Sequence, residues 1–176
     1  MWLSGMEGAV AVGVENVPRL VAGCTGRRGG GAVGGPGVLG EVTLPGVRRS
    51  VAYARGFVRE LASGYERLDD LVMVVSETVA NAITHTASGL EGGRVRVVLA
   101  AGPDCYRLEV TDDGAAGGRP FVKAEVGAET GRGMRIVAGL ASRWGYRTDG
   151  PRTVVWAEFP APAVEGRGRE PVSDPG

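Results

Sequence analysis

The spacing of hydrophobic residues between positions 41 and 160 changes from strand-like to helical and back again, and this order restricts the folds open to the chain. Helical spacing recurs in three segments: 48–65, 67–86 and 133–145. Strand character is found in four others: 41–45, 94–101, 105–112 and a hairpin at 146–160. The short first strand ends at Pro45, and the hairpin turns at Asp149-Gly150. The order predicts an α+β fold, a two-layer α/β sandwich with helices on one face of a mixed, mostly antiparallel sheet.

The two ends of the chain differ in composition from this central region. Residues 1–40 are rich in glycine, which loses much backbone entropy on ordering and buries little in return. Residues 161–176 are also polar and rich in Gly and Pro. We therefore expect two disordered tails around one domain at 41–160. A phosphate-binding P-loop is not expected in the first tail, because the required Gly-Lys-Ser/Thr is missing.

The charge balance argues against several functions. The 20 basic and 20 acidic residues cancel, so neither nucleic acid nor an anionic membrane surface is an expected partner. No apolar run reaches the roughly 20 residues of a membrane span. The first residues, MWLSGMEGAV, lack the pattern of a signal peptide. The sequence therefore predicts a cytoplasmic protein.

Three polar side chains, Glu77, Asn81 and His85, follow one another at intervals of four in the second helical segment. Residues four apart share one side of a helix, so the three form a file. The neighbouring apolar residues Val75 and Val79 place this file beside the buried face. The file is either an ordinary solvated stripe or a site in which the carboxylate accepts a proton and the amide oxygen binds Mg²⁺.

Two further stretches have a simple structural explanation and a functional one. At Asp112-Asp113-Gly114 a strand ends in carboxylates and glycine, which is either a plain turn or a pocket whose aspartate accepts a hydrogen bond from an amine. Gly131 and Gly133 stand at the beginning of the third helical segment. They form either a flexible hinge or an anion site at the helix N-terminus.

Taken together and in this order, the three stretches resemble the N, G1 and G2 boxes of the nucleotide-binding domain that GHKL ATPases and kinases share. The segments VVSETVANAITHT and TGRGMRIVAGLASRWG are most similar to the small anti-sigma factor serine/threonine kinases and their actinobacterial relatives. The resemblance covers roughly 42–159 and implies the Bergerat-type form of the sandwich. In the G1 box, Ala116 replaces the second glycine of Asp-x-Gly-x-Gly.

The resemblance also implies roles for individual residues. Glu77 would be the catalytic base, and Asn81 would hold Mg²⁺ on the phosphates of ATP. Asp112 would bind the adenine amine, and Gly114 would make room for the ring. The remaining cofactor-binding positions lie at the G2 box: Gly131, Arg132, Gly133 and Met134. Loop 115–130 would be a lid over ATP, and His85 would fix the end of its helix.

As a function, the resemblance implies an ATP-dependent kinase that phosphorylates a STAS-type anti-sigma factor antagonist, sequesters a sigma factor, or does both. A homodimer is one arrangement that the resemblance allows. Ala116 keeps open an alternative, a catalytically weak nucleotide-binding module that regulates a partner. A sensor histidine kinase fragment is disfavoured, because the chain's one histidine lies inside the N box. A sandwich without any ligand would require three coincidental motifs.

Overall fold

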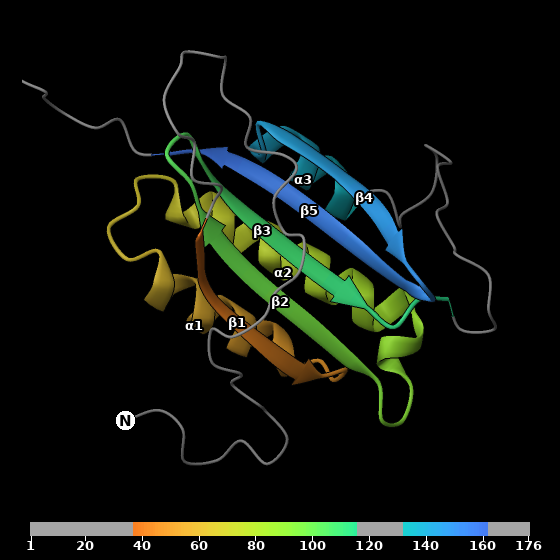
Figure 1. The fold of residues 1–176 in the computed structure, drawn as a ribbon. Helices are drawn as coiled ribbons and strands as arrows, with labels where there is room; N and C mark the ends of the chain where they lie inside the picture. The colour runs from red at the N-terminus through yellow and green to blue at the C-terminus, as the bar shows by residue number, and fades with distance from the viewer. Residues whose placement is uncertain (1–36, 116–131, 162–176) are drawn as a thin grey trace, which may run out of the picture.

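In the computed structural model, which describes residues 37–115 and 132–161, five strands form one sheet in the order β1-β2-β3-β5-β4 (Figure 1). Every neighbouring pair of these strands is antiparallel. The strands are β1 (Gly37–Pro45), β2 (Arg94–Ala101), β3 (Cys105–Asp112), β4 (Arg143–Asp149) and β5 (Arg152–Pro160). The helices are α1 (Ser50–Leu61), α2 (Leu68–His85), α3 (Arg132–Leu140) and the short 3₁₀ helix η1 (Ala87–Gly89).

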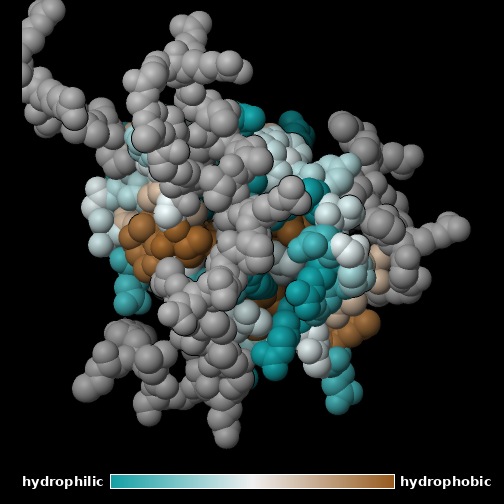
Figure 2. All heavy atoms as spheres, in the orientation of Figure 1, coloured by the Kyte–Doolittle hydropathy of each residue, from teal (hydrophilic) through white to brown (hydrophobic). Residues whose placement is uncertain are grey.

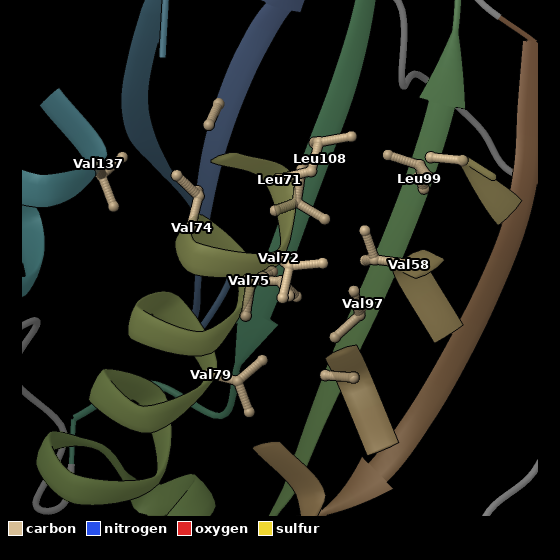
Figure 3. Packing of buried hydrophobic residues seen from close by; sticks show 14 of the residues in the cluster. Val58, Leu71, Val72, Val74, Val75, Val79, Val97, Leu99, Leu108 and Val137 are labelled. Carbon is tan, nitrogen blue, oxygen red and sulfur yellow. The ribbon is translucent and has the colours of Figure 1, made fainter. Parts of the chain in front are cut away.

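Helices α1, α2 and α3 lie behind the sheet in Figure 1, so the molecule has two layers. Apolar side chains of both layers meet between them. Figure 3 shows examples from three helices and two strands: Val58 of α1, Val79 of α2, Val137 of α3, Val97 of β2 and Leu108 of β3. The predicted two-layer α/β sandwich is therefore confirmed. Among the described helices, none is long and apolar enough to cross a membrane.

Helix α2 lies along the centre of the sheet and supplies much of the core. Val74, Val75 and Val79 are completely buried. The hydroxyl groups of Ser76 and Thr78 are also buried, and each donates to a backbone carbonyl one turn earlier, at 2.6 and 2.7 Å. These bonds satisfy polar groups that would otherwise be costly to bury.

The third helix is shorter than its sequence pattern predicts. The helical spacing at 133–145 is wrong beyond Leu140, because Arg143–Asp149 forms strand β4 at the edge of the sheet. Pairing with β5 decides this: the amide of Ser142 donates to the carbonyl of Glu158 at 2.9 Å. Gly145 lies flat against the indole of Trp156, where an added Cβ would come within 2.7 Å of a ring carbon. Tertiary contacts thus override local helical preference.

Strand β1 begins earlier than expected. It starts at Gly37, so residues 37–40 of the predicted tail are part of the sheet and pair with the end of β2. A Cβ on Gly40 would lie 2.7 Å from a methyl carbon of Leu61 in α1. The glycine-rich composition therefore reflects a close packing of strand against helix at this point. The turn at Asp149-Gly150 is confirmed, with Gly150 at φ +58°.

The sheet face turned away from the helices carries a network of ion pairs. Figure 2 shows a band of hydrophilic side chains on this side of the molecule, next to hydrophobic patches. Glu109, whose side chain is 3% exposed, accepts hydrogen bonds from Arg107 at 2.8 Å and from both terminal nitrogens of Arg147 at 2.9–3.0 Å. Arg107 also donates to Glu158 at 2.6 Å and lies over the ring of Trp156. The buried carboxylates of Glu109 and Glu158 are thus each paired with two arginines.

We expect Glu109→Ala to lower the free energy of unfolding by about 3 kcal/mol, because the buried guanidinium of Arg107 loses one of its two carboxylates. Arg147→Ala should cost less than about 1 kcal/mol, because the Arg147 side chain is 41% exposed and water replaces part of the lost interaction. Urea denaturation of both variants measures the difference. Equal losses would show that burial does not determine the strength of this network.

Candidate functional site

The polar file of α2 lies at the border of the core, as the sequence pattern predicts. Glu77 and Asn81 are partly buried, whereas His85, at the end of the helix, is exposed. Thr86 rather than His85 fixes the helix end, since its hydroxyl donates to the carbonyl of Ala82 at 2.6 Å and accepts from the amide of Ser88 at 3.1 Å. The file thus presents a carboxylate and a carboxamide next to each other beside the apolar face.

Gly133, in the first turn of α3, lies directly against these two side chains. A Cβ added there would stand 2.8 Å from Glu77 Oε2 and 3.1 Å from Asn81 Nδ2. Any residue larger than glycine would displace them. The N-terminal turn of α3, with the unpaired amide groups that a helix N-terminus presents, is therefore next to the carboxylate and amide of α2.

Asp112 ends strand β3 and is 6% exposed. Its Oδ1 accepts a hydrogen bond from the amide of Gly114 at 2.7 Å. Burial raises the pKa of the Asp112 carboxyl above its ordinary value. Backbone hydrogen bonds from Gly114 and Thr153 act in the opposite direction, and the charge of Asp113 adds to the increase in pKa. Asp112 is therefore a carboxylate that the fold holds in place without a neutralising arginine among the described residues.

Gly114 makes the turn after Asp112 possible. Its φ is +82°, and a Cβ would lie 1.8 Å from the carbonyl oxygen of Pro151 in the β4–β5 turn. The carbonyl of Gly114 accepts a hydrogen bond from the amide of Ala87 at 2.7 Å. Since Ala87 follows the last turn of α2, this bond joins the G1 turn to the C-terminal end of the helix. The three stretches therefore meet around α2.

The other predicted site residues have different outcomes. Arg132 is the first residue of α3. Met134 is partly buried and packs against the hydrophobic core. Gly131, Ala116 and all of the predicted lid except Ala115 lie outside the described residues. The roles assigned to these positions stay predictions.

Sequence reasoning missed Ser88, which lies in η1 and is completely buried. Its hydroxyl donates to the carbonyl of Arg94 and accepts from the amide of Asp113. It also missed the backbone contact of Thr153 with Asp112. The Thr-x-Ser after the polar file is typical of a hydroxyl-capped turn, and this pattern was a local signal for the turn that contains Ser88. The contact between Thr153 and Asp112 joins distant parts of the chain and has no local signal.

The arrangement offers three distinct chemical capacities. A partly exposed carboxylate, Glu77, is able to accept a proton from a hydroxyl group. The amide oxygen of Asn81 is a hard ligand suited to a magnesium ion that also binds phosphates. The buried carboxylate of Asp112 is a hydrogen-bond acceptor for an amine. Within the described residues, no group of three His, Cys, Asp or Glu side chains forms a separate metal site.

Comparison with known proteins identifies the family of the chain. The Histidine kinase-like ATPase domain family matches residues 43–159. The chain therefore belongs to the family of histidine kinase-like ATPase domains, and the predicted resemblance to GHKL proteins is confirmed.

Two curated relatives are named serine-protein kinase RsbW. The protein from Listeria monocytogenes is 27% identical over 89 residues, which are 51% of this chain and 50% of the relative. The protein from Oceanobacillus iheyensis is 26% identical over 91 residues, which are 49% of this chain and 58% of the relative. The chain thus spans little more than half the length of these relatives.

Among solved structures, the RsbU and RsbW domains of Rv1364c from Mycobacterium tuberculosis match 70% of this chain and 32% of that chain. The sequence identity is 21% and the TM-score 0.48.

We expect Gly133→Ala to weaken ATP binding about tenfold, since the new methyl group displaces Glu77 and Asn81 from their positions. Gly139→Ala is the matched control, because Gly139 lies in the same helix and a Cβ there meets nothing within 4 Å. The control should leave ATP affinity unchanged and stabilise the fold by roughly 0.5–1 kcal/mol through helix propensity. Calorimetric titration of ATP with thermal unfolding tests both. Equal ATP affinities in the two variants would show that the contact with Gly133 does not matter.

Proposed function

We propose that this chain is an ATP-dependent regulatory protein serine/threonine kinase of the anti-sigma factor type. It would phosphorylate a STAS-type anti-sigma factor antagonist, sequester a sigma factor, or do both. The observation that carries the proposal is the contact of Gly133 with Glu77 and Asn81. This contact supports the proposal because a helix N-terminus lies beside a carboxylate and a carboxamide, to which we assign the roles of base and metal ligand in phosphoryl transfer.

ATP would lie over the exposed side of α2. In the proposal, Asp112 accepts a hydrogen bond from the exocyclic amine of adenine. The glycine at 114 does not itself make room for the ring, because the Pro151 carbonyl fills the space beside it; it allows the turn with positive φ that holds Asp112. The phosphates then lie at the N-terminus of α3, where amide groups and the helix dipole favour negative charge. The residues we assign to this end are Gly131, Arg132, Gly133 and Met134.

Asn81 would hold Mg²⁺, which supplies charge neutralisation on the phosphates when it is bound. Glu77 would accept the proton of the substrate hydroxyl group while the oxygen of that hydroxyl group bonds to the terminal phosphorus atom of ATP. The bond from that phosphorus to the bridging oxygen breaks in the same reaction, and ADP leaves. Arg132 is our candidate for stabilising the charge that develops on the transferred group.

The relatives are serine-protein kinases by name, which supports a protein substrate. The antagonist and the sigma factor are the partners that the resemblance to anti-sigma factor kinases implies. A protein that switches between an antagonist and a sigma factor would work in the cytoplasm, and a homodimer is compatible with this role. No direct contact with nucleic acid or membrane is part of the proposal, in keeping with the net charge of zero.

A second candidate function is a nucleotide-binding module that regulates a partner without useful catalysis. Ala116 favours it, because the second glycine of the G1 pattern is replaced there. In this case ATP would change the affinity for a partner through differential binding to two conformations.

We expect Asp112→Asn to abolish measurable ATP binding in a protein that still folds. The amide of Gly114 still binds the carboxamide oxygen. The NH₂ group then faces the adenine amine, and two donors cannot pair. Calorimetric titration with and without Mg²⁺, together with thermal unfolding, measures both effects. Unchanged ATP affinity in this variant would remove Asp112 from the site.

Because the pKa of Asp112 is raised, we expect both the stability of the protein and its ATP affinity to depend on pH. Because the folded state binds this proton at a higher pH than the unfolded state does, the stability of the wild type relative to Asp112→Asn rises as pH falls from neutral toward 3.8. ATP affinity should fall over the same range, since a protonated carboxyl is a poorer acceptor. A stability difference independent of pH would contradict the buried-carboxylate interpretation.

We expect Glu77→Gln to retain ATP binding and to reduce phosphoryl transfer by about 10²–10⁴-fold, because the amide cannot accept the hydroxyl proton. The measurement is transfer of labelled phosphate from ATP-Mg²⁺ to a STAS-domain protein of the same organism. If the wild type binds ATP but transfers nothing, and Glu77→Gln still regulates its partner, the protein is the non-catalytic module.

A further inference from the structure

We propose that Ser88 is a positioning residue that makes the site select adenine over guanine by holding the turn that carries Asp112. The inference rests on the proposed nucleotide site and adds a residue that acts through Asp112. Ser88 lies three positions after His85, beyond the end of the polar file.

The Ser88 hydroxyl ties three segments of the chain together. Its side chain is 0% exposed. Its Oγ donates to the carbonyl of Arg94 at 2.6 Å and accepts from the amide of Asp113 at 2.9 Å. Arg94 begins β2, and Asp113 follows directly after the end of β3. One buried hydroxyl therefore uses both its donor and its acceptor capacity to fix the peptide group next to Asp112.

Two further bonds support the same turn. The amide of Arg94 donates to Asp113 Oδ2 at 2.7 Å, and the amide of Ala87 donates to the carbonyl of Gly114 at 2.7 Å. The turn that follows Asp112 is thus held at Gly114 by Ala87, which follows α2, and at the Asp113 side chain by Arg94, which begins β2. A carboxylate on this backbone has little freedom to change its direction.

The position of Ser88 is itself fixed by close backbone packing. A Cβ on Gly46 would lie 1.5 Å from the carbonyl oxygen of Ser88, and one on Gly93 would lie 2.2 Å from it. The amide of Gly46 also donates to the carbonyl of Gly93 at 2.8 Å. Because two glycines enclose its backbone, Ser88 cannot shift to restore a lost hydrogen bond.

The direction of the carboxylate decides between the two purines. Adenine presents an amine donor at carbon 6, which a carboxylate accepts, whereas guanine presents a carbonyl acceptor there, which a carboxylate repels. Discrimination of this kind requires the acceptor to stay at one position. If the turn is loosened, Asp112 loses the bond to adenine and also moves away from guanine.

The test is the ratio of ATP to GTP affinity in Ser88→Ala, measured by calorimetric titration of the full chain with Mg²⁺. The variant leaves a buried carbonyl and a buried amide without their partner, so ATP affinity should fall about tenfold and the ATP-to-GTP ratio with it. An unchanged ratio in a folded Ser88→Ala protein that still binds ATP overturns the inference alone. If the wild type binds neither nucleotide, the proposed function itself fails.

Ser50→Ala is the matched control. The hydroxyl of Ser50 is also 0% exposed and donates to a backbone carbonyl, that of Pro45, at 2.6 Å, but it makes no contact with the Asp112 turn. General loss of stability should therefore be similar in the two serine variants, and only Ser88→Ala should change the ratio. A similar change of the ATP-to-GTP ratio in Ser88→Ala and Ser50→Ala would contradict the inference, because it would show that Ser88 acts only through general stability.

A second pair of variants keeps the inference testable if Ser88→Ala does not fold. The Asp113 side chain is 33% exposed, so Asp113→Ala removes the bond to the Arg94 amide with little risk to the fold. Asp113→Asn removes the same charge but keeps an acceptor oxygen. A lower ATP-to-GTP ratio in Asp113→Ala than in Asp113→Asn supports the inference, and equal ratios contradict it.

Discussion

The candidate site depends on one close contact, that of the Gly133 backbone with the side chains of Glu77 and Asn81. Because glycine has no side chain, α3 approaches α2 closely enough for its first turn to lie beside a carboxylate and a carboxamide. A larger residue would separate the two helices or turn the polar groups away. The charged ligand we propose needs these groups and the helix N-terminus at the same time. The candidate site therefore depends on a glycine at position 133.

Helix α2 both supplies the core and presents polar side chains at the surface. Its buried side supplies Val74, Val75 and Val79 to the core, and a helix so placed is held rigidly by the sheet below it. Its other side keeps Glu77 and Asn81 partly exposed. Since the functional groups stand on the best-packed helix, their position follows from the core rather than from a loop. Such rigidity is what preorganised binding and catalysis require.

Local patterns predicted the layers, the strands and the polar file, because hydrophobic period and turn residues act within a few positions of each other. They were wrong where distant contacts decide. The period at 133–145 continues as a helix in the sequence, but pairing with β5 makes Arg143–Asp149 a strand. The packing of Gly40 on Leu61 extends β1 into an apparent tail. The Thr-x-Ser pattern signals only the local turn at Thr86, and the contact of Ser88 with Asp113 joins residues 25 positions apart, so the sequence pattern could not predict it.

The buried carboxylates of this fold differ in their hydrogen-bond partners. Glu109 and Glu158 are 3% exposed and are enclosed by arginines, so their charges are compensated inside the sheet. Asp112 is 6% exposed, and within the described residues only backbone amides bind it. Its raised pKa shows that these amides do not fully offset the cost of burial. A buried carboxylate with a raised pKa and no charged partner among the described residues is a candidate for a functional site. In the function we propose, the adenine amine is a further donor to this carboxylate.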